Sequence, residues 1–164
     1  MINTTPVRKS ITVDADQKRA FDFFTARHAT WWPSTYHIGS SDYEAAVIEP
    51  FAGGRWFERG VDGAEADWGK VLVWEPPERL VLAWQITPDF QFDPELVTEI
   101  EVRFEPIGPN QTRVDLEHRY FDRFGERAAE MRAIFDSGGV PGAPQGWAGI
   151  LREFAAAVTH PRAR

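Results

Sequence analysis

Residues 53–85, GGRWFERGVDGAEADWGKVLVWEPPERLVLAWQ, decide the fold, and they hold four of the seven tryptophans of the chain. Two turn signals divide this stretch into three extended segments. The Asp62-Gly63 dipeptide tolerates the positive φ angles of a tight hairpin turn. The Pro76-Pro77 dipeptide has no amide donor and therefore ends a strand. We predict a meander of three strands, at about 54–61, 65–74 and 79–87.

Alternating side chains indicate which face of each predicted strand is buried. Large apolar residues occupy every second position from Leu80 to Ile86, and the same pattern runs through 96–104 and 112–120 with charged residues between. Successive side chains of a strand point to opposite faces, so the last two segments form a hairpin with one dry and one wet face. The inner face of the meander carries enough indole rings either to fill a thick core or to line a cavity.

The rest of the chain supplies outer strands and helices. Further strands are predicted at 7–13 and 43–49, and helices at 125–135, at 147–158 and from an N-cap at Asp14 or Asp16 to about residue 29. A short second helix should break near Pro33, and the glycine- and proline-rich residues 136–146 should form a loop. This order predicts one α+β domain over 1–164, with its core at about 7–158. A curved antiparallel sheet of about six to seven strands would wrap the long C-terminal helix.

Composition narrows the classes of function. A chain of 164 residues can bury about 70% of its extended surface as one domain. The absence of cysteine excludes disulfides and thiolate ligands, and His28 and His37 have no third ligand at a metal spacing, so we predict no metal and no cofactor. A formal net charge of -7 argues against nucleic acid. The chain has neither an apolar run of membrane-spanning length nor a signal core, so we expect no membrane contact and a cytoplasmic location.

Three segments together resemble a known family. The stretch 53–85, then TRVDLEHRYFDRFG and then GWAGILREFA, are similar to the SRPBCC, or START-like, superfamily. Within it they resemble bacterial proteins related to the C-terminal domain of the heat-shock-chaperone ATPase activator. The resemblance covers about 7–158 and implies the helix-grip fold of birch-pollen allergen and polyketide cyclases, often with an apolar cavity between sheet and C-terminal helix. It implies no fixed catalytic constellation.

His118 is the polar residue of greatest interest. Its parity places it on the inner face with Leu116 and Tyr120. In one interpretation it is a core histidine that hydrogen-bonds to a backbone carbonyl or to Glu58. In the other it is the acid or base of a pocket, because its pKa near neutrality suits proton transfer.

Glu58 has two interpretations that strand parity cannot separate. It shares the parity of Trp56, so an inward-facing carboxylate would need a partner such as His118 or Arg55. If Phe57 faces inward instead, Glu58 is merely solvated.

These observations support three hypotheses of function. The first is a small protein that binds a hydrophobic or aromatic molecule between the sheet and the C-terminal helix. The residues expected to line that space are Phe24, Trp56, Trp84, Val102, Leu116, His118, Met131, Trp147 and Leu151. The second is a polyketide cyclase or dehydratase that uses His118 as acid or base, with Glu58 or Tyr120 orienting the substrate. The third, which rests on the resemblance alone, is stimulation of a chaperone ATPase. Whether the chain forms a homodimer is left open.

Overall fold

The computed structural model describes residues 4–137 and 146–159. Seven strands form an antiparallel sheet in the order β1-β7-β6-β5-β4-β3-β2. The strands are β1 (Val7–Val13), β2 (Tyr43–Ile48), β3 (Arg55–Gly60), β4 (Glu65–Glu75), β5 (Arg79–Trp84), β6 (Thr98–Gly108) and β7 (Gln111–Arg119). The predicted α+β class and strand number are therefore confirmed.

The helical segments are α1 (Gln17–Thr25), α2 (His28–Trp31), the 3-10 helix η1 (Phe121–Arg127), α3 (Ala128–Asp136) and α4 (Gly146–Thr159). The predicted N-cap at Asp16 is confirmed, because its carboxylate accepts a 2.8 Å hydrogen bond from the amide of Arg19. The first predicted helix is interrupted after Thr25 and resumes as α2, whose His28 and Trp31 are both buried. Residues 138–145 of the predicted loop lie outside the described residues.

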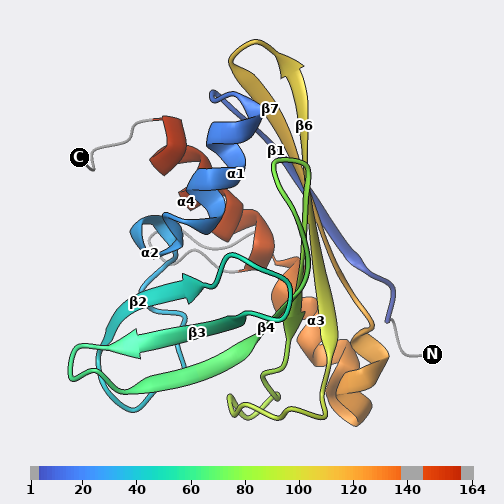
Figure 1. Ribbon diagram of the computed structural model, residues 1–164. Coiled ribbons are helices and arrows are strands. Elements are labelled where there is room, and N and C mark those ends of the chain that lie inside the picture. The colour runs from blue at the N-terminus through green and yellow to red at the C-terminus, as the bar shows by residue number, and fades with distance from the viewer. Residues whose placement is uncertain (1–3, 138–145, 160–164) are drawn as a thin grey trace.

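Helix α4 crosses the concave side of the curved sheet and forms the other half of the core (Figure 1). Its buried face is the predicted stripe of Trp147, Ile150, Leu151, Phe154 and Val158. The Phe154 ring lies 5.2 Å from the rings of Phe24 and Trp31, so α4 and the first two helices share one apolar layer over the sheet.

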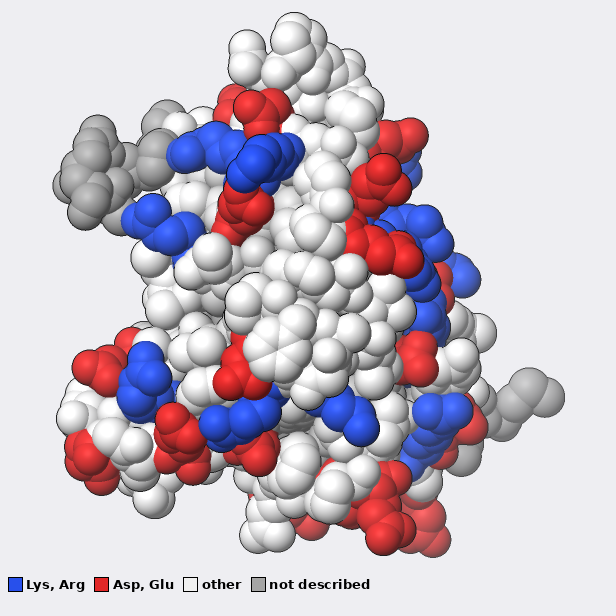
Figure 2. Space-filling view, in the orientation of Figure 1, with Lys and Arg blue, Asp and Glu red and all other residues white. Residues whose placement is uncertain are grey.

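The outer face of β1, β6 and β7 is charged, as the alternation predicts. Acidic and basic side chains interleave along this edge of the molecule (Figure 2). Arg119 pairs with Glu99 at 2.9 Å and with Glu101 at 2.7 Å, and Arg79 pairs with Glu101 at 2.6 Å. The network lies beside Val81, which is buried on the outer side of the sheet.

Two predicted strand boundaries are wrong, and both corrections concern the connection between β5 and β6. The strand β5 ends at Trp84 rather than at 87, because Gln85 turns to a separate short ladder in which its carbonyl accepts from the amide of Asp93 at 2.9 Å. The strand β6 begins at Thr98 rather than at 95. The Asp93 carboxylate accepts from the amide of Glu95 at 2.9 Å, an Asx turn that competes with the sheet.

The prediction that Tyr120 continues the inner face of β7 is also wrong. The strand ends at Arg119, and Tyr120 adopts a left-handed conformation with φ 73° that turns the chain into η1. Its side chain is 39% exposed, and the guanidinium of Arg123 lies 4.2 Å from the centre of its ring. His118 is therefore the last residue of β7 on the inner face of the sheet.

Candidate functional site

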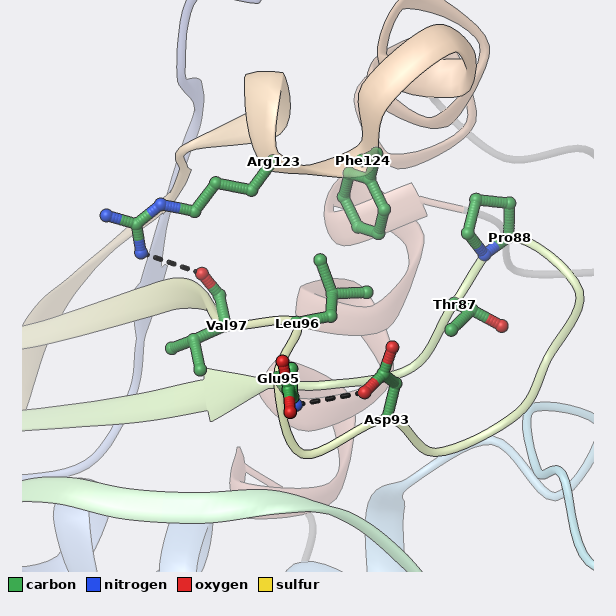
Figure 3. Close-up of a pocket in the computed structure, with 8 residues that line it drawn as sticks. All are labelled: Thr87, Pro88, Asp93, Glu95, Leu96, Val97, Arg123 and Phe124. Atoms are coloured by element: carbon green, nitrogen blue, oxygen red, sulfur yellow. Dashed lines mark hydrogen bonds between the residues drawn. The ribbon is translucent and has the colours of Figure 1, made fainter.

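A pocket of about 670 Å³ opens between the β5–β6 connection and η1. Its apolar walls are Pro88, Leu96, Val97 and Phe124, and its polar groups are Thr87, Asp93, Glu95 and Arg123. Leu96 from the connection and Phe124 from η1 point toward one another across the space (Figure 3). Four apolar and four polar residues thus line an open surface pocket.

Two arginines of η1 tie the walls of the pocket together. Arg123 donates a 2.8 Å hydrogen bond to the carbonyl oxygen of Val97. Arg127 forms a 2.7 Å ion pair with Asp89 of the connection. The connection is also held to itself, because the side-chain amide of Gln85 donates to the carbonyl oxygen of Pro94 at 3.0 Å. The β5–β6 connection is thus attached to η1 at two points, Asp89 and Val97, one on each side of the pocket.

The inner wall of the pocket continues into a run of ring contacts that we call the aromatic column. It consists of Phe124, Phe121, His118, Phe135, Trp147, Trp84 and Trp56. Starting from the pocket, the centroid separations are 5.8 Å for Phe124–Phe121, 4.6 Å for Phe121–His118 and 4.7 Å for His118–Phe135. Trp84 then lies 5.2 Å from Phe135 and 5.5 Å from Trp56. The column therefore links the pocket to the interior of the sheet.

His118 has hydrogen-bond partners for both ring nitrogens. The indole N–H of Trp147 donates to Nδ1 at 3.1 Å, which assigns the proton of the neutral ring to Nε2. That Nε2–H then donates to the Thr98 hydroxyl at 2.9 Å, and the hydroxyl donates to the carbonyl oxygen of Trp84 at 3.0 Å. Burial lowers the pKa of His118 to about 3. His118 is thus a neutral, fully bonded core residue, and its partners are Thr98 and Trp147 rather than a backbone carbonyl or Glu58.

His28 repeats this arrangement in the other half of the core. The indole N–H of Trp56 donates to its Nε2 at 3.2 Å, so its Nδ1–H donates to the carbonyl oxygen of Phe24, also at 3.2 Å. Burial lowers its pKa to about 3 as well. Each buried imidazole therefore accepts one tryptophan N–H, and both must be uncharged in the folded protein.

The two buried histidines predict that the protein loses stability on mild acidification. The folded-state pKa of each is about 3, below the ordinary value of 6.5, so the unfolded chain takes up protons that the folded protein does not. Their contribution is full above about pH 6.5 and falls toward pH 3, by roughly 1.4 kcal/mol per pH unit for each histidine. Urea unfolding at about pH 7 and about pH 5 measures the change. In His118→Gln the free energy of unfolding should vary with pH about half as steeply, and an unchanged slope would contradict the assignment.

Glu58 is buried, so the inward interpretation of its strand position is correct, but its partners are neither His118 nor Arg55. Its carboxylate accepts from the indole of Trp68 at 2.8 Å, from the amide of Ile38 at 2.6 Å and from Nδ1 of His37 at 3.0 Å. The side chain of Arg55 instead pairs with Asp67 at 2.8 Å. Glu58 therefore fastens the segment before β2 to the sheet. Phe57, between Trp56 and Glu58, is buried as well, and the guanidinium of Arg55 lies 4.0 Å from the centre of its ring.

The structure buries most of the predicted site residues together but not beside the pocket. The side chains expected to line a ligand space are buried, apart from Trp84, which is half-buried; they are Phe24, Trp56, Trp84, Val102, Leu116, His118, Met131, Trp147 and Leu151. None of them lines the pocket between the connection and η1. Four of them, Trp56, Trp84, His118 and Trp147, belong to the aromatic column behind it. Tyr120 does not share the interior with His118 or Glu58.

The pocket residues were missed because they lie outside regular strands. Leu96 and Val97 looked like the start of β6, and Phe124 lay in a segment between predicted elements. The prolines and aspartates of residues 88–94 were the available signal, since they indicate an ordered loop, and functional residues concentrate in loops. In residues 4–137 and 146–159, no three acidic or histidine side chains gather closely enough to hold a metal ion. Over the same residues, no helix is long and apolar enough to cross a membrane.

The curved sheet, its crossing C-terminal helix and its aromatic interior define a helix-grip protein. The family profile described as Activator of Hsp90 ATPase homolog 1-like protein matches residues 14–159, and the chain belongs to that family. The SRPBCC resemblance of the sequence is thereby confirmed. No functionally curated protein matches the chain.

The solved structures that are similar to this chain over nearly its whole length include two that share more than 30% of its residues. One is the anthrahydroquino-gamma-pyrone synthase Txn09, with 38% identity, a TM-score of 0.64 and coverage of 93% of this chain and 96% of the synthase. The other is CalC from Micromonospora echinospora, a self-sacrificing resistance protein, with 31% identity, a TM-score of 0.65 and coverage of 94% of each chain. A protein from Arthrobacter aurescens, at 19% identity and a TM-score of 0.61, shares the fold.

Proposed function

We propose that the protein binds a flat hydrophobic or aromatic small molecule, which enters through the pocket between the β5–β6 connection and η1. The observation that carries the proposal is the continuity of that pocket with the aromatic column. Phe124 lines the pocket and contacts Phe121, whose ring packs on His118. A flat ligand that displaces Leu96 or Phe124 would meet ring faces and edges from there to Trp84. Such surfaces favour aromatic ligands in offset or edge-to-face geometry.

The similar structures support the same ligand class. A synthase of an anthrahydroquino-gamma-pyrone handles a flat, oxygenated, fused-ring molecule, and it shares 38% of its residues with this chain over 93% of the length. The sheet–helix space expected to receive the ligand is occupied by packed side chains at its centre, including Leu151 and Phe154. The proposal therefore places the entrance at the end of the sheet, with the predicted residues Trp84, His118 and Trp147 as the inner wall.

Leu96→Trp should block the pocket without unfolding the protein. Leu96 lies on the wall opposite Phe124, and the larger ring would fill space that a ligand needs. We expect the variant to bind anthraquinone-2-sulfonate about tenfold or more weakly than the wild type, because a filled pocket removes most of the apolar contact. Quenching of tryptophan fluorescence during titration gives the affinity.

Ile107→Trp is the matched control for this experiment. It adds the same fluorophore at a side chain on β6 that is 51% exposed and outside the pocket. Wild-type affinity in Ile107→Trp together with lost affinity in Leu96→Trp supports the proposal. Equal binding by all three proteins would place the ligand elsewhere, and no binding by the wild type would contradict the proposed ligand class for this probe.

A ring-forming enzyme is the second candidate, favoured by the synthase relative. His118 remains the sequence-based choice of acid or base, but both of its nitrogens are bonded, so it could act only after exchanging Thr98 or Trp147 for substrate. Loss of turnover in His118→Ala with retained binding would favour this candidate. Unchanged turnover in that variant would remove His118 from it.

Stimulation of a chaperone ATPase is the third candidate and rests on the family description. A rise in ATP hydrolysis by the cognate heat-shock chaperone on addition of this protein would support it. No rise, at protein concentrations well above that of the chaperone, would retire it.

A further inference from the structure

Trp84 differs from the other buried indoles in its hydrogen bonding. Its Nε1–H is buried and has no hydrogen-bond partner among the described residues. Five other tryptophans each have an acceptor for this group: Trp31, Trp32, Trp56, Trp68 and Trp147 donate to Phe23 O, Tyr36 O, His28, Glu58 and His118. A buried donor without a partner costs about 1–3 kcal/mol, and such groups are rare in folded proteins. This unpaired N–H is therefore available to an acceptor from outside the chain.

The side chains in ring contact with Trp84 are aromatic. Its ring is contacted by Trp56 at 5.5 Å, Phe135 at 5.2 Å and Trp147 at 6.1 Å, the last two nearly perpendicular to it at interplanar angles of 85° and 81°. These neighbours present ring faces and edges, and the indole N–H groups of Trp56 and Trp147 are donors already in use. The nearby acceptor nitrogen of His118 is taken by Trp147. The backbone carbonyl of Trp84 itself accepts from Thr98, which holds the residue in place.

We propose that Trp84 Nε1–H is the ligand-recognising donor of this protein, and that it binds the carbonyl oxygen of an aromatic ketone or quinone. This inference rests on the proposed function and names its ligand class. A neutral oxygen fits better than a carboxylate, because the imidazole of His118 is uncharged and the neighbours of the Trp84 ring are themselves aromatic. The aromatic neighbours would pack on the fused rings while the single donor fixes their orientation.

The experiment compares two probes that differ only in their carbonyl groups. Anthraquinone-2-sulfonate and anthracene-2-sulfonate share a three-ring frame and an anionic substituent. The wild type should bind the quinone about tenfold more tightly, the usual worth of one hydrogen bond to an otherwise unpaired donor. Trp84→Phe keeps an aromatic ring but loses the N–H, so the preference should fall to about twofold or less.

Trp31→Phe is the matched control, since it also removes a buried indole N–H, but one outside the aromatic column that already donates to the carbonyl oxygen of Phe23. It should keep the tenfold preference and should lower the thermal midpoint, whereas Trp84→Phe should lower the midpoint less, because it loses ring volume but no hydrogen bond. In the wild type, the indole N–H resonance that disappears in Trp84→Phe should move downfield with the quinone and much less with the anthracene.

The outcomes separate this inference from the proposed function. Equal affinity of the wild type for the two probes, or an undiminished quinone preference in Trp84→Phe, would overturn the role of Trp84 and leave the pocket standing. If the wild type binds neither probe, the proposed function fails for this ligand class, and the inference fails with it.

Discussion

Leu151→Asp is expected to unfold the protein or to reduce its free energy of unfolding by about 4 kcal/mol or more. Leu151 is 1% exposed and lies on the buried face of α4 between Trp147 and Phe154. An aspartate there would place a carboxylate in an apolar layer with no donor positioned for it, which is among the most costly single substitutions. Far-ultraviolet circular dichroism and urea titration measure the loss.

Ala156→Asp is the control, because it introduces the same carboxylate on an exposed position of the same helix. It should cost less than about 1 kcal/mol, mainly through the unfavourable placement of a negative charge near a helix C-terminus. If Leu151→Asp were as stable as Ala156→Asp, helix α4 would not pack on the sheet through this face, and the helix-grip arrangement would be wrong.

The architecture could be predicted from the sequence because buried residues recur at every second position of a strand and every third or fourth position of a helix. The alternation in β6 and β7 specifies one apolar face of the sheet, and the stripe along α4 specifies one apolar face of the helix. Each of these faces can be buried only against the other. His118 falls within such a regular stretch, so its burial followed from position alone. Its hydrogen-bond partners could not be predicted in this way. Thr98 lies on β6 and is brought near His118 by the pairing of β6 with β7, and Trp147 lies on α4.

The pocket could not be predicted, because it depends on where regular structure ends. Residues 95–97 continue the alternation of β6, yet the Asx turn at Asp93 removes them from the sheet and turns Leu96 toward Phe124. Similarly, the positive φ of Tyr120 ends β7 one residue earlier than parity suggests. Local side-chain hydrogen bonds and single backbone conformations decide such boundaries, and neither has a periodic signature.

A β-bulge in the pairing of β3 with β4 is a third feature that the alternation of side chains does not reveal, and it positions a hydrogen-bond partner of Glu58. In the pairing of β3 with β4, Trp56 lies opposite Gly69 and Phe57 opposite Asp67, so Trp68 is the extra residue. The bulge directs the indole of Trp68 to the carboxylate of Glu58 at 2.8 Å, while the carbonyl oxygen of Trp68 accepts from the amide of Gln85 at 2.9 Å. One irregularity thus supplies the partner of a buried charge and anchors the start of the β5–β6 connection.

Gly69→Ala should therefore be severely destabilising, by about 3 kcal/mol or more, even though it adds a single methyl group. A Cβ at this position would lie 1.7 Å from the carbonyl oxygen of Ala83 and 2.8 Å from its carbonyl carbon. Both are backbone atoms of β5 within the sheet, so relief requires β4 and β5 to separate and their hydrogen bonds to lengthen. Separation there would also disturb Gln85, so affinity for anthraquinone-2-sulfonate should fall together with stability.

Gly108→Ala is the matched control, because a Cβ there would meet nothing closer than Gln111 at 3.9 Å, an ordinary contact. Its free energy of unfolding should change by less than about 1 kcal/mol, with unaltered probe binding. Urea unfolding of both variants decides the matter. If Gly69→Ala were as stable as Gly108→Ala, β4 and β5 would not approach as closely as the bulge requires. The account of Trp68 as the residue that brings Glu58 and Gln85 to their partners would then be wrong.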